Sequence, residues 1–143
     1  MQHIAILNPK WNILPKILSG EKTIETRWYV NKIAPWNQIH ENDEIFIKDA
    51  RKPVTAKCFV DHVEQYEITE PEAMLPILLK YKPLLGFTQE SFTDLTWLNK
   101  KRYGILIFIK NVQLINPFAI DKTGFGSAAA WLCLKKDIND LIL

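Results

Sequence analysis

Hydrophobic and polar positions in the first part of the chain follow two spacings, which predict a strand, a helix and a second strand. Residues 1–7 form a short apolar run that is typical of a buried strand. Apolar residues between positions 13 and 18 then recur at helical spacing, and Gly20 is suited to end that helix. From Thr23 onward, β-branched and aromatic residues alternate with polar ones, which predicts a strand.

The same patterns predict more strands and a helical insertion in the rest of the chain. Segment 103–109 is almost continuously apolar, so we expect it at the centre of the sheet. Segment 111–120 either extends it or forms the next strand. Two helical patterns lie together and predict an insertion over about residues 68–102. The expected strands are 44–48, 54–63 and 128–134, and the expected helices are 71–85, 89–99 and 135–143.

The order of these elements favours the α+β class. Nothing in it repeats as β-α-β units, which disfavours a doubly wound parallel sheet. Strands of mixed polarity joined by short turns favour a small, strongly bent sheet or barrel with flanking helices. A length of 143 residues fits one domain, so we expect residues 1–143 to fold as a single unit.

Composition narrows the functional classes. The formal charge of +2 does not announce a nucleic-acid binder, so any electrostatic attraction must come from local clusters. Cys58 and Cys133 form no metal-ligand or redox pattern, and with no signal-peptide pattern they favour a reducing, cytoplasmic compartment. The apolar runs are too short to span a bilayer, and we expect no metal or cofactor.

Three charged residues converge where the first helix gives way to the second strand. Alternation along a strand places Glu25 and Arg27 on one face, and Trp28 on the other. Lys22 lies in the turn, where its flexible stem can bring the ammonium to the Glu25 side. The simpler alternative is an exposed ion pair, worth roughly 0–1 kcal/mol.

This stretch resembles the GxKxxExR motif of the ASCH family, within the PUA-like superfamily. The matching positions are Gly20, Lys22, Glu25 and Arg27. The run 42–47 also resembles the family's Gly-Asp turn before a strand, with Asn42 in place of glycine. Asparagine tolerates positive φ better than most residues. The resemblance implies a PUA-like β-barrel with a cleft bordered by the motif.

The resemblance also implies a function in RNA binding, because related domains hold single-stranded nucleotides or an extruded modified base. The expected partner is therefore RNA, single-stranded nucleic acid or a nucleoside. Lys22 and Arg27 are suited to phosphate, and the Glu25 carboxylate can accept a hydrogen bond from a base amino group. The expected ligand-binding residues are Lys22, Glu25, Arg27, Trp28, Trp36, Lys122 and Phe125.

Several aromatic and basic residues have two interpretations each. Trp36 lies in an expected loop and either stacks on a base or folds onto the core. Trp11 is expected in the core, with a stacking platform as the alternative. Arg51 is expected in a solvated turn. Residues 100–102 are expected to interact with a helix C-terminus, with a phosphate contact as the alternative.

An enzyme is the second hypothesis that the resemblance implies. Some ASCH proteins are amidohydrolases of acylated cytidine that use the lysine of the motif, and others are reported as ribonucleases. Lys22 matches that lysine, but Glu25 stands where the amidohydrolases have threonine, and no counterpart of their distant glutamate can be assigned. The candidate catalytic residues are Lys22, Glu25 and, without a visible activating partner, Ser127. The helical insertion either covers the cleft as a lid or serves protein interaction.

Overall fold

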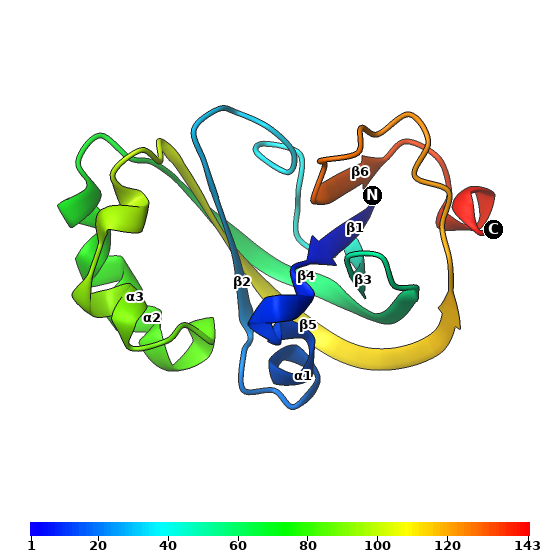
Figure 1. The fold of residues 1–143 in the computed structure, drawn as a ribbon, viewed down its shortest axis with the longest axis horizontal. Coiled ribbons are helices and arrows are strands. Elements are labelled where there is room, and N and C mark those ends of the chain that lie inside the picture. Colours follow the sequence, from blue (N-terminus) through cyan, green and yellow to red (C-terminus); the bar gives the residue numbers. More distant parts are fainter.

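A computed structural model describes residues 1–143, and a single mixed sheet dominates the fold (Figure 1). Its strand order is β2-β5-β4-β3-β1-β6. Strands β1 and β3 run parallel, and all other neighbours are antiparallel. The strands are β1 (Gln2–Leu7), β2 (Ile24–Tyr29), β3 (Glu44–Asp49), β4 (Val54–Glu67), β5 (Tyr103–Phe118) and β6 (Trp131–Leu134).

The sheet curls strongly because its two longest strands bend together. Strands β4 and β5 pair over most of their length, with register shifts at three points. Each bulge bends its strand and increases the local twist. The curl brings the two edge strands, β2 and β6, towards each other without pairing them, so the half-barrel keeps an open seam. This arrangement confirms the α+β class and the strongly bent sheet.

The first helix covers residues 13–18, the segment in which apolar residues recur at helical spacing. The Asn8 side chain caps the amide of Lys10, and one 3-10 turn spans Pro9–Trp11. Asn12 then adopts left-handed φ, and α1 (Ile13–Leu18) follows. Gly20 has a φ of +82°, so the helix ends at the residue best able to adopt that conformation.

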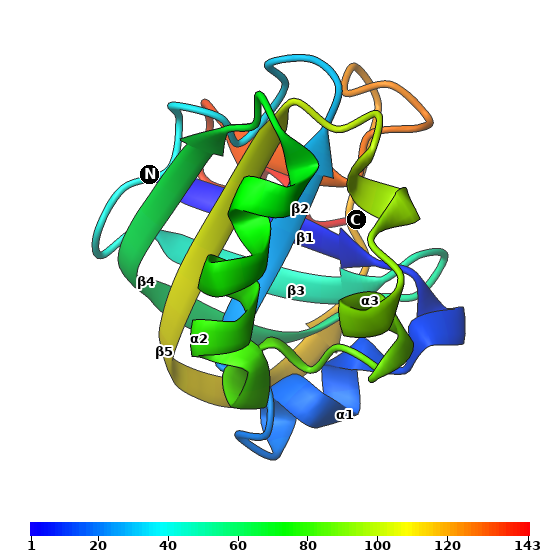
Figure 2. The same ribbon diagram turned by 90° about the vertical axis from the view of Figure 1, so that its left-hand side faces the viewer.

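The segment between β4 and β5 is helical, and it lies across the outer face of the sheet (Figure 2). After a 3-10 turn at Pro71–Met74, α2 (Leu75–Leu85) packs Leu78 against Ile24 and Leu106 in a second core cluster. None of the helices of the structure is long and apolar enough to cross a membrane.

Two helical expectations are wrong in extent. Segment 89–99 is not one helix: α3 (Glu90–Thr93) stops because Asp94 is extended, and a 3-10 turn at Thr96–Leu98 follows. The Asp94 carboxylate accepts the Thr96 amide hydrogen, a local bond that competes with helix continuation. The expected C-terminal helix is only a 3-10 turn at Ile138–Leu141.

The structure decides the open alternative for segment 111–120 and moves the start of the last strand. Segment 111–120 mostly continues β5, which resolves the alternative left open by the sequence. The last strand starts at Trp131 rather than at residue 128. Residues 121–130 form an irregular loop, where Gly124 and Gly126 both have positive φ.

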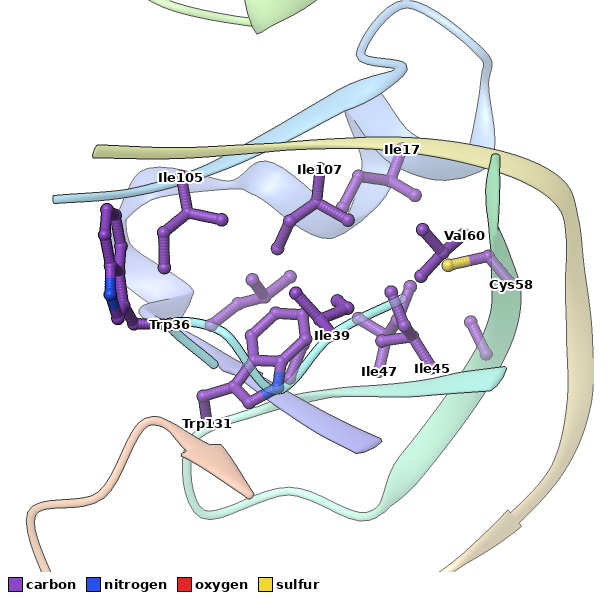
Figure 3. Close-up of a cluster of buried hydrophobic side chains, with 13 residues drawn as sticks. Ile17, Trp36, Ile39, Ile45, Ile47, Cys58, Val60, Ile105, Ile107 and Trp131 are labelled. Carbon is purple, nitrogen blue, oxygen red and sulfur yellow. The ribbon is translucent and has the colours of Figure 1, made fainter. Parts of the chain in front are cut away.

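The central core fills the inside of the curl (Figure 3). Isoleucines from β3 and β5 face one another across it, and Trp131 projects between them. Trp36 belongs to this cluster: only 8% of it is exposed, and its ring centroid lies 4.9 Å from that of Tyr103. The structure therefore places Trp36 in the core, the second of its two interpretations.

Candidate functional site

The turn between α1 and β2 is held by backbone bonds that fix the direction of Lys22. The Lys22 amide donates to the Lys16 carbonyl, and the Thr23 amide donates to the Leu84 carbonyl at the end of α2. The turn is thus fastened to the helical insertion, and Lys22 projects inward with 3% of its surface exposed.

The end of the insertion covers the Lys22 side chain. The ammonium donates a hydrogen bond to the Leu85 carbonyl and lies over the Phe87 ring, 5.7 Å from its centroid. A Cβ atom on Gly86 would meet the Lys22 stem at 3.0 Å, a tight contact, and the φ of +67° also favours glycine. Burial lowers the pKa of the Lys22 ammonium, and the Glu25 carboxylate opposes part of that shift.

Glu25 is buried between the two cations of the motif. Its Oε1 lies 3.9 Å from Lys22 Nζ, and its Oε2 lies 3.9 Å from Arg27 Nη2. Oε1 accepts the Thr26 amide hydrogen at 2.9 Å. Oε2 is fully buried and has no hydrogen-bond partner. A buried carboxylate oxygen without a donor is costly, so it marks the point at which a ligand would add most.

Arg27 bridges the open seam of the sheet. From edge strand β2, its guanidinium donates to the carbonyl oxygen of Ala130 at 3.2 Å and to that of Ile6 at 3.4 Å. It also lies over the Trp131 ring, 5.0 Å from the centroid. These contacts join β2 to β1 and to the residue before β6, where the backbone does not pair.

A cleft of about 400 Å³ opens at this seam. We call it the seam cleft. Glu25 and Arg27 line its polar side, and Trp28 and Trp97 line its aromatic side. The two indole rings pack edge to face, with centroids 5.2 Å apart at 75°. Trp28 Nε1 donates to Thr26 Oγ1 at 3.0 Å, which holds the ring in place. Trp11, Lys101 and Ala130 are further lining residues.

The structure brings together the residues of the motif and separates them from the other candidates. Glu25, Arg27 and Trp28 share the seam cleft, whereas Lys22 supports Glu25 from behind and does not line the cleft. Lys122 and Ser127 line a neighbouring pocket. Phe125 packs against the apolar cluster between the 121–130 loop and the C-terminal turn.

Three lining residues were missed or misassigned from sequence. Trp11 is 67% exposed at the cleft, so its expected place in the core is wrong. Trp97 comes from the insertion and was not among the expected ligand-binding residues. Lys101 lies at the cleft, which suits the alternative of a ligand contact better than a helix cap. A tryptophan three residues before a basic cluster was the available signal for this side of the cleft.

An open half-barrel with a polar and aromatic cleft at its seam is the fold that this chain shares with solved ASCH proteins. ZmASCH from Zymomonas mobilis is similar over 97% of this chain and 91% of its own, at 17% identity and a TM-score of 0.67. No family model and no curated protein matches the sequence. The likeness therefore establishes the fold.

Two further structures show the same likeness. A serine-to-alanine variant of ZmASCH from Zymomonas mobilis has 18% identity and a TM-score of 0.67, covering 97% of this chain and 92% of that one. The hypothetical protein PH0355 has 20% identity and a TM-score of 0.52, covering 80% of this chain and all of its own length (100%). Both agree with the fold that the GxKxxExR resemblance implied.

Proposed function

We propose that the seam cleft binds a single nucleotide, either free or as one residue of single-stranded RNA. The observation that carries the proposal is the buried, unpaired Oε2 of Glu25, a residue that lines the same cleft as Trp28 and Trp97. A carboxylate oxygen accepts hydrogen bonds only, so its partner must be a donor. Base amino groups on a flat ring supply such a donor together with a face for stacking.

The two sides of the cleft suit the two parts of a base. Glu25 accepts from the amino group of cytosine, adenine or guanine, and uracil has no amino group to offer. Trp28, Trp97 and exposed Trp11 provide indole surface for the ring. Stacking of a base on an aromatic side chain contributes roughly 1–3 kcal/mol. The ligand is thus recognised by its base, while its backbone remains near the mouth of the cleft.

The cations of the motif act through Glu25 in this proposal. The Arg27 guanidinium is already engaged by two backbone carbonyls, and the Lys22 ammonium by one. Both lie close to the carboxylate, with one nitrogen of each 3.9 Å from one of its oxygens. In this proposal the two cations therefore orient Glu25 rather than contact phosphate directly.

Fluorescence polarisation with labelled cytidine, adenosine and uridine hexamers at low salt tests this proposal. We expect the cytidine and adenosine hexamers to bind, and Glu25→Gln to weaken them about tenfold or more, since a hydrogen bond to a charged group contributes roughly 1.5–3 kcal/mol. The uridine hexamer should lose less affinity in the Glu25→Gln variant, because uracil has no amino group to donate to the carboxylate. Glu21→Gln removes an exposed carboxylate from the same turn and is the matched control.

Absence of binding by all three hexamers would contradict the proposal. Equal affinities of the wild type and the Glu25→Gln variant would show that the carboxylate does not read the base. Thermal unfolding of both variants separates loss of binding from loss of structure.

Hydrolysis of an acylated cytidine is a second candidate, because burial lowers the pKa of Lys22 in the direction that a catalytic amine needs. Against it, the amine is committed to the Leu85 carbonyl and lies behind Glu25. Mass spectrometry of acetylcytidine incubated with the wild type and with Lys22→Ala tests this activity. Deacetylation that disappears in the variant would favour the enzyme, and no turnover would favour binding alone.

A further inference from the structure

A second cavity of about 470 Å³ adjoins the seam cleft. The two share four lining residues, namely Ile6, Leu7, Asn8 and Ala130, so only the end of β1 and the residue before β6 separate them. The Ile6 amide donates to the Ala130 carbonyl at 2.9 Å, which makes this wall a fixed part of the fold. A ligand longer than one base would pass from one cavity into the other.

The charge of this second cavity is one-sided. Lys10, Arg51 and Lys122 line it, and no aspartate or glutamate does. None of the three cations forms an ion pair with a carboxylate anywhere in the structure. Lys122 donates only to the Ser127 carbonyl, at 3.1 Å. We call this cavity, defined by the three cations, the basic pocket.

A fourth cation lies buried next to it. Lys48 on β3 is 8% exposed, pairs in register with Ile6, and its ammonium has neither a hydrogen bond nor an ion pair. Burial lowers the pKa of Lys48, and the nearby charge of Lys122 lowers it further, while Asp49 opposes the shift only in part. Neighbouring cations raise the affinity of a site for an anion.

We propose that the basic pocket binds the phosphate of the nucleotide whose base occupies the seam cleft. This inference rests on the proposed function and deepens it, because it makes the ligand a phosphorylated nucleotide or an RNA chain rather than a bare nucleoside. Arginine and lysine side chains are the usual protein partners of phosphate oxygens. Arg51, expected from sequence to be merely solvated, is thereby assigned a binding role.

The arrangement also divides the work between the two cavities. In this proposal the seam cleft recognises the base through Glu25 and indole surface. Its own arginine, Arg27, already donates hydrogen bonds to two backbone carbonyls. The basic pocket holds cations that are free to contact an anion. Phosphate contacts carry no sequence information but add affinity and fix orientation, as in other nucleic-acid complexes.

Calorimetric titration with cytidine, cytidine 5′-monophosphate and cytidine 3′-monophosphate tests the inference. We expect at least one monophosphate to bind about fivefold or more tightly than cytidine, since charge-assisted bonds are about twice as strong as neutral ones. The double variant Arg51→Gln/Lys122→Gln should lose that gain. Lys135→Gln/Lys136→Gln removes two exposed lysines outside both cavities and is the matched control.

The salt dependence of RNA binding gives a second readout that does not depend on the stability of the variants. Each lost phosphate contact should reduce the slope of log affinity against log salt by about 0.7 for a single strand. With a cytidine hexamer, the Arg51→Gln/Lys122→Gln variant should therefore show a shallower slope than the wild type, and the control variant an unchanged one. Inorganic phosphate should compete with the monophosphates but not with cytidine.

The outcomes separate this inference from the function on which it rests. If cytidine binds and neither monophosphate binds more tightly, the basic pocket does not hold the phosphate, and the seam cleft proposal stands. A gain that survives in the Arg51→Gln/Lys122→Gln variant also overturns the inference. Failure of all three probes and of the hexamer overturns both proposals.

Discussion

Two buried polar networks lie in the same curled sheet, and they differ in how completely their hydrogen bonds are made. In one, Asp43 accepts from the N-terminal ammonium at 3.0 Å, from His3 Nε2 at 2.8 Å and from the His40 amide at 3.0 Å. His3 Nδ1 accepts from Trp131 Nε1 at 3.1 Å, so every group has a partner. In the other network, Glu25 keeps one buried oxygen without a donor.

The difference separates a structural network from a candidate site. Buried polar groups in folded proteins are nearly always paired, because an unpaired one forfeits its hydration without compensation. The Asp43 network follows that rule and fixes the N-terminus and β1 to the turn before β3. The Glu25 network breaks it at one atom, beside a cleft of nucleotide size. We infer that the missing partner of Glu25 comes with the ligand.

Replacing one carboxylate in each network is the strongest test of whether the two networks differ in their contribution to stability. Asp43→Asn should lower the free energy of unfolding by about 3 kcal/mol, because it weakens three hydrogen bonds, two of them to charged or chargeable donors. Glu25→Gln should cost only about 1 kcal/mol, since one of its oxygens makes no bond to lose. Urea denaturation of both variants measures the difference.

RNA binding should respond in the opposite order. Glu25→Gln should impair hexamer binding far more than Asp43→Asn does when the latter is measured under conditions where it is folded. Equal losses of stability in the two variants would mean that the Glu25 network is structural as well.

Alanine variants of Gly86 and Gly20 test whether the insertion holds the Glu25 network in place. Gly86→Ala should destabilise the fold by about 2 kcal/mol, since the residue has a φ of +67° and its new Cβ would meet the Lys22 stem at 3.0 Å. Gly20→Ala carries only the conformational cost, about 1 kcal/mol, because its φ is +82° and nothing lies within 4 Å. Thermal and urea unfolding of the two variants isolate the contact with Lys22.

The same contact should show in function. Gly86→Ala should weaken RNA binding more than Gly20→Ala does, because Lys22 can no longer approach Glu25 unchanged. Identical binding by the two variants would mean that the insertion covers Lys22 without affecting RNA binding.

Local signals in the sequence predicted the parts of the site that are close in the chain. Strand alternation placed Glu25 and Arg27 on one face and Trp28 on the other, and the turn brought Lys22 to Glu25, where the ammonium lies 3.9 Å from Oε1. Asn42 has a φ of +68°, as expected of a residue that replaces glycine. These features depend on spacing and on backbone preferences, which sequence carries directly.

The remainder of the site depends on long-range packing that no local pattern records. The seam cleft exists because the curled sheet brings Arg27 to Ala130, which is 103 positions away in the chain. Trp97 reaches the cleft through the fold of the insertion, where a helix breaks at Asp94. Trp11 is exposed although it was expected in the core, and Trp36 takes the core place that was one of its two interpretations, because the path of a loop decides which aromatic ring is covered.

As the pH falls, we expect the fully paired Asp43 network to weaken through His3 at a pH above that at which carboxylates take up protons. Burial lowers the pKa of His3, and the N-terminus and His40 lower it further, while Asp43 opposes the shift through its hydrogen bond and its charge. Below the ordinary value of 6.5, the unfolded chain then binds a proton that the folded His3 does not. The free energy of unfolding should therefore decrease as pH falls below 6.5, with a slope of at most about 1.4 kcal/mol per pH unit from this group.

Urea denaturation at several pH values between neutrality and about 5 measures this slope, since a histidine shift acts in that range. His62→Gln changes an exposed imidazole outside the Asp43 network and is the comparison variant. Titration of the His3 ring by NMR assigns the effect. A His3 pKa raised above 6.5, with a free energy of unfolding that increases as pH falls, would mean that His3 is protonated in the fold, with Trp131 unable to donate to Nδ1, and that the Asp43 network is no better satisfied than that of Glu25.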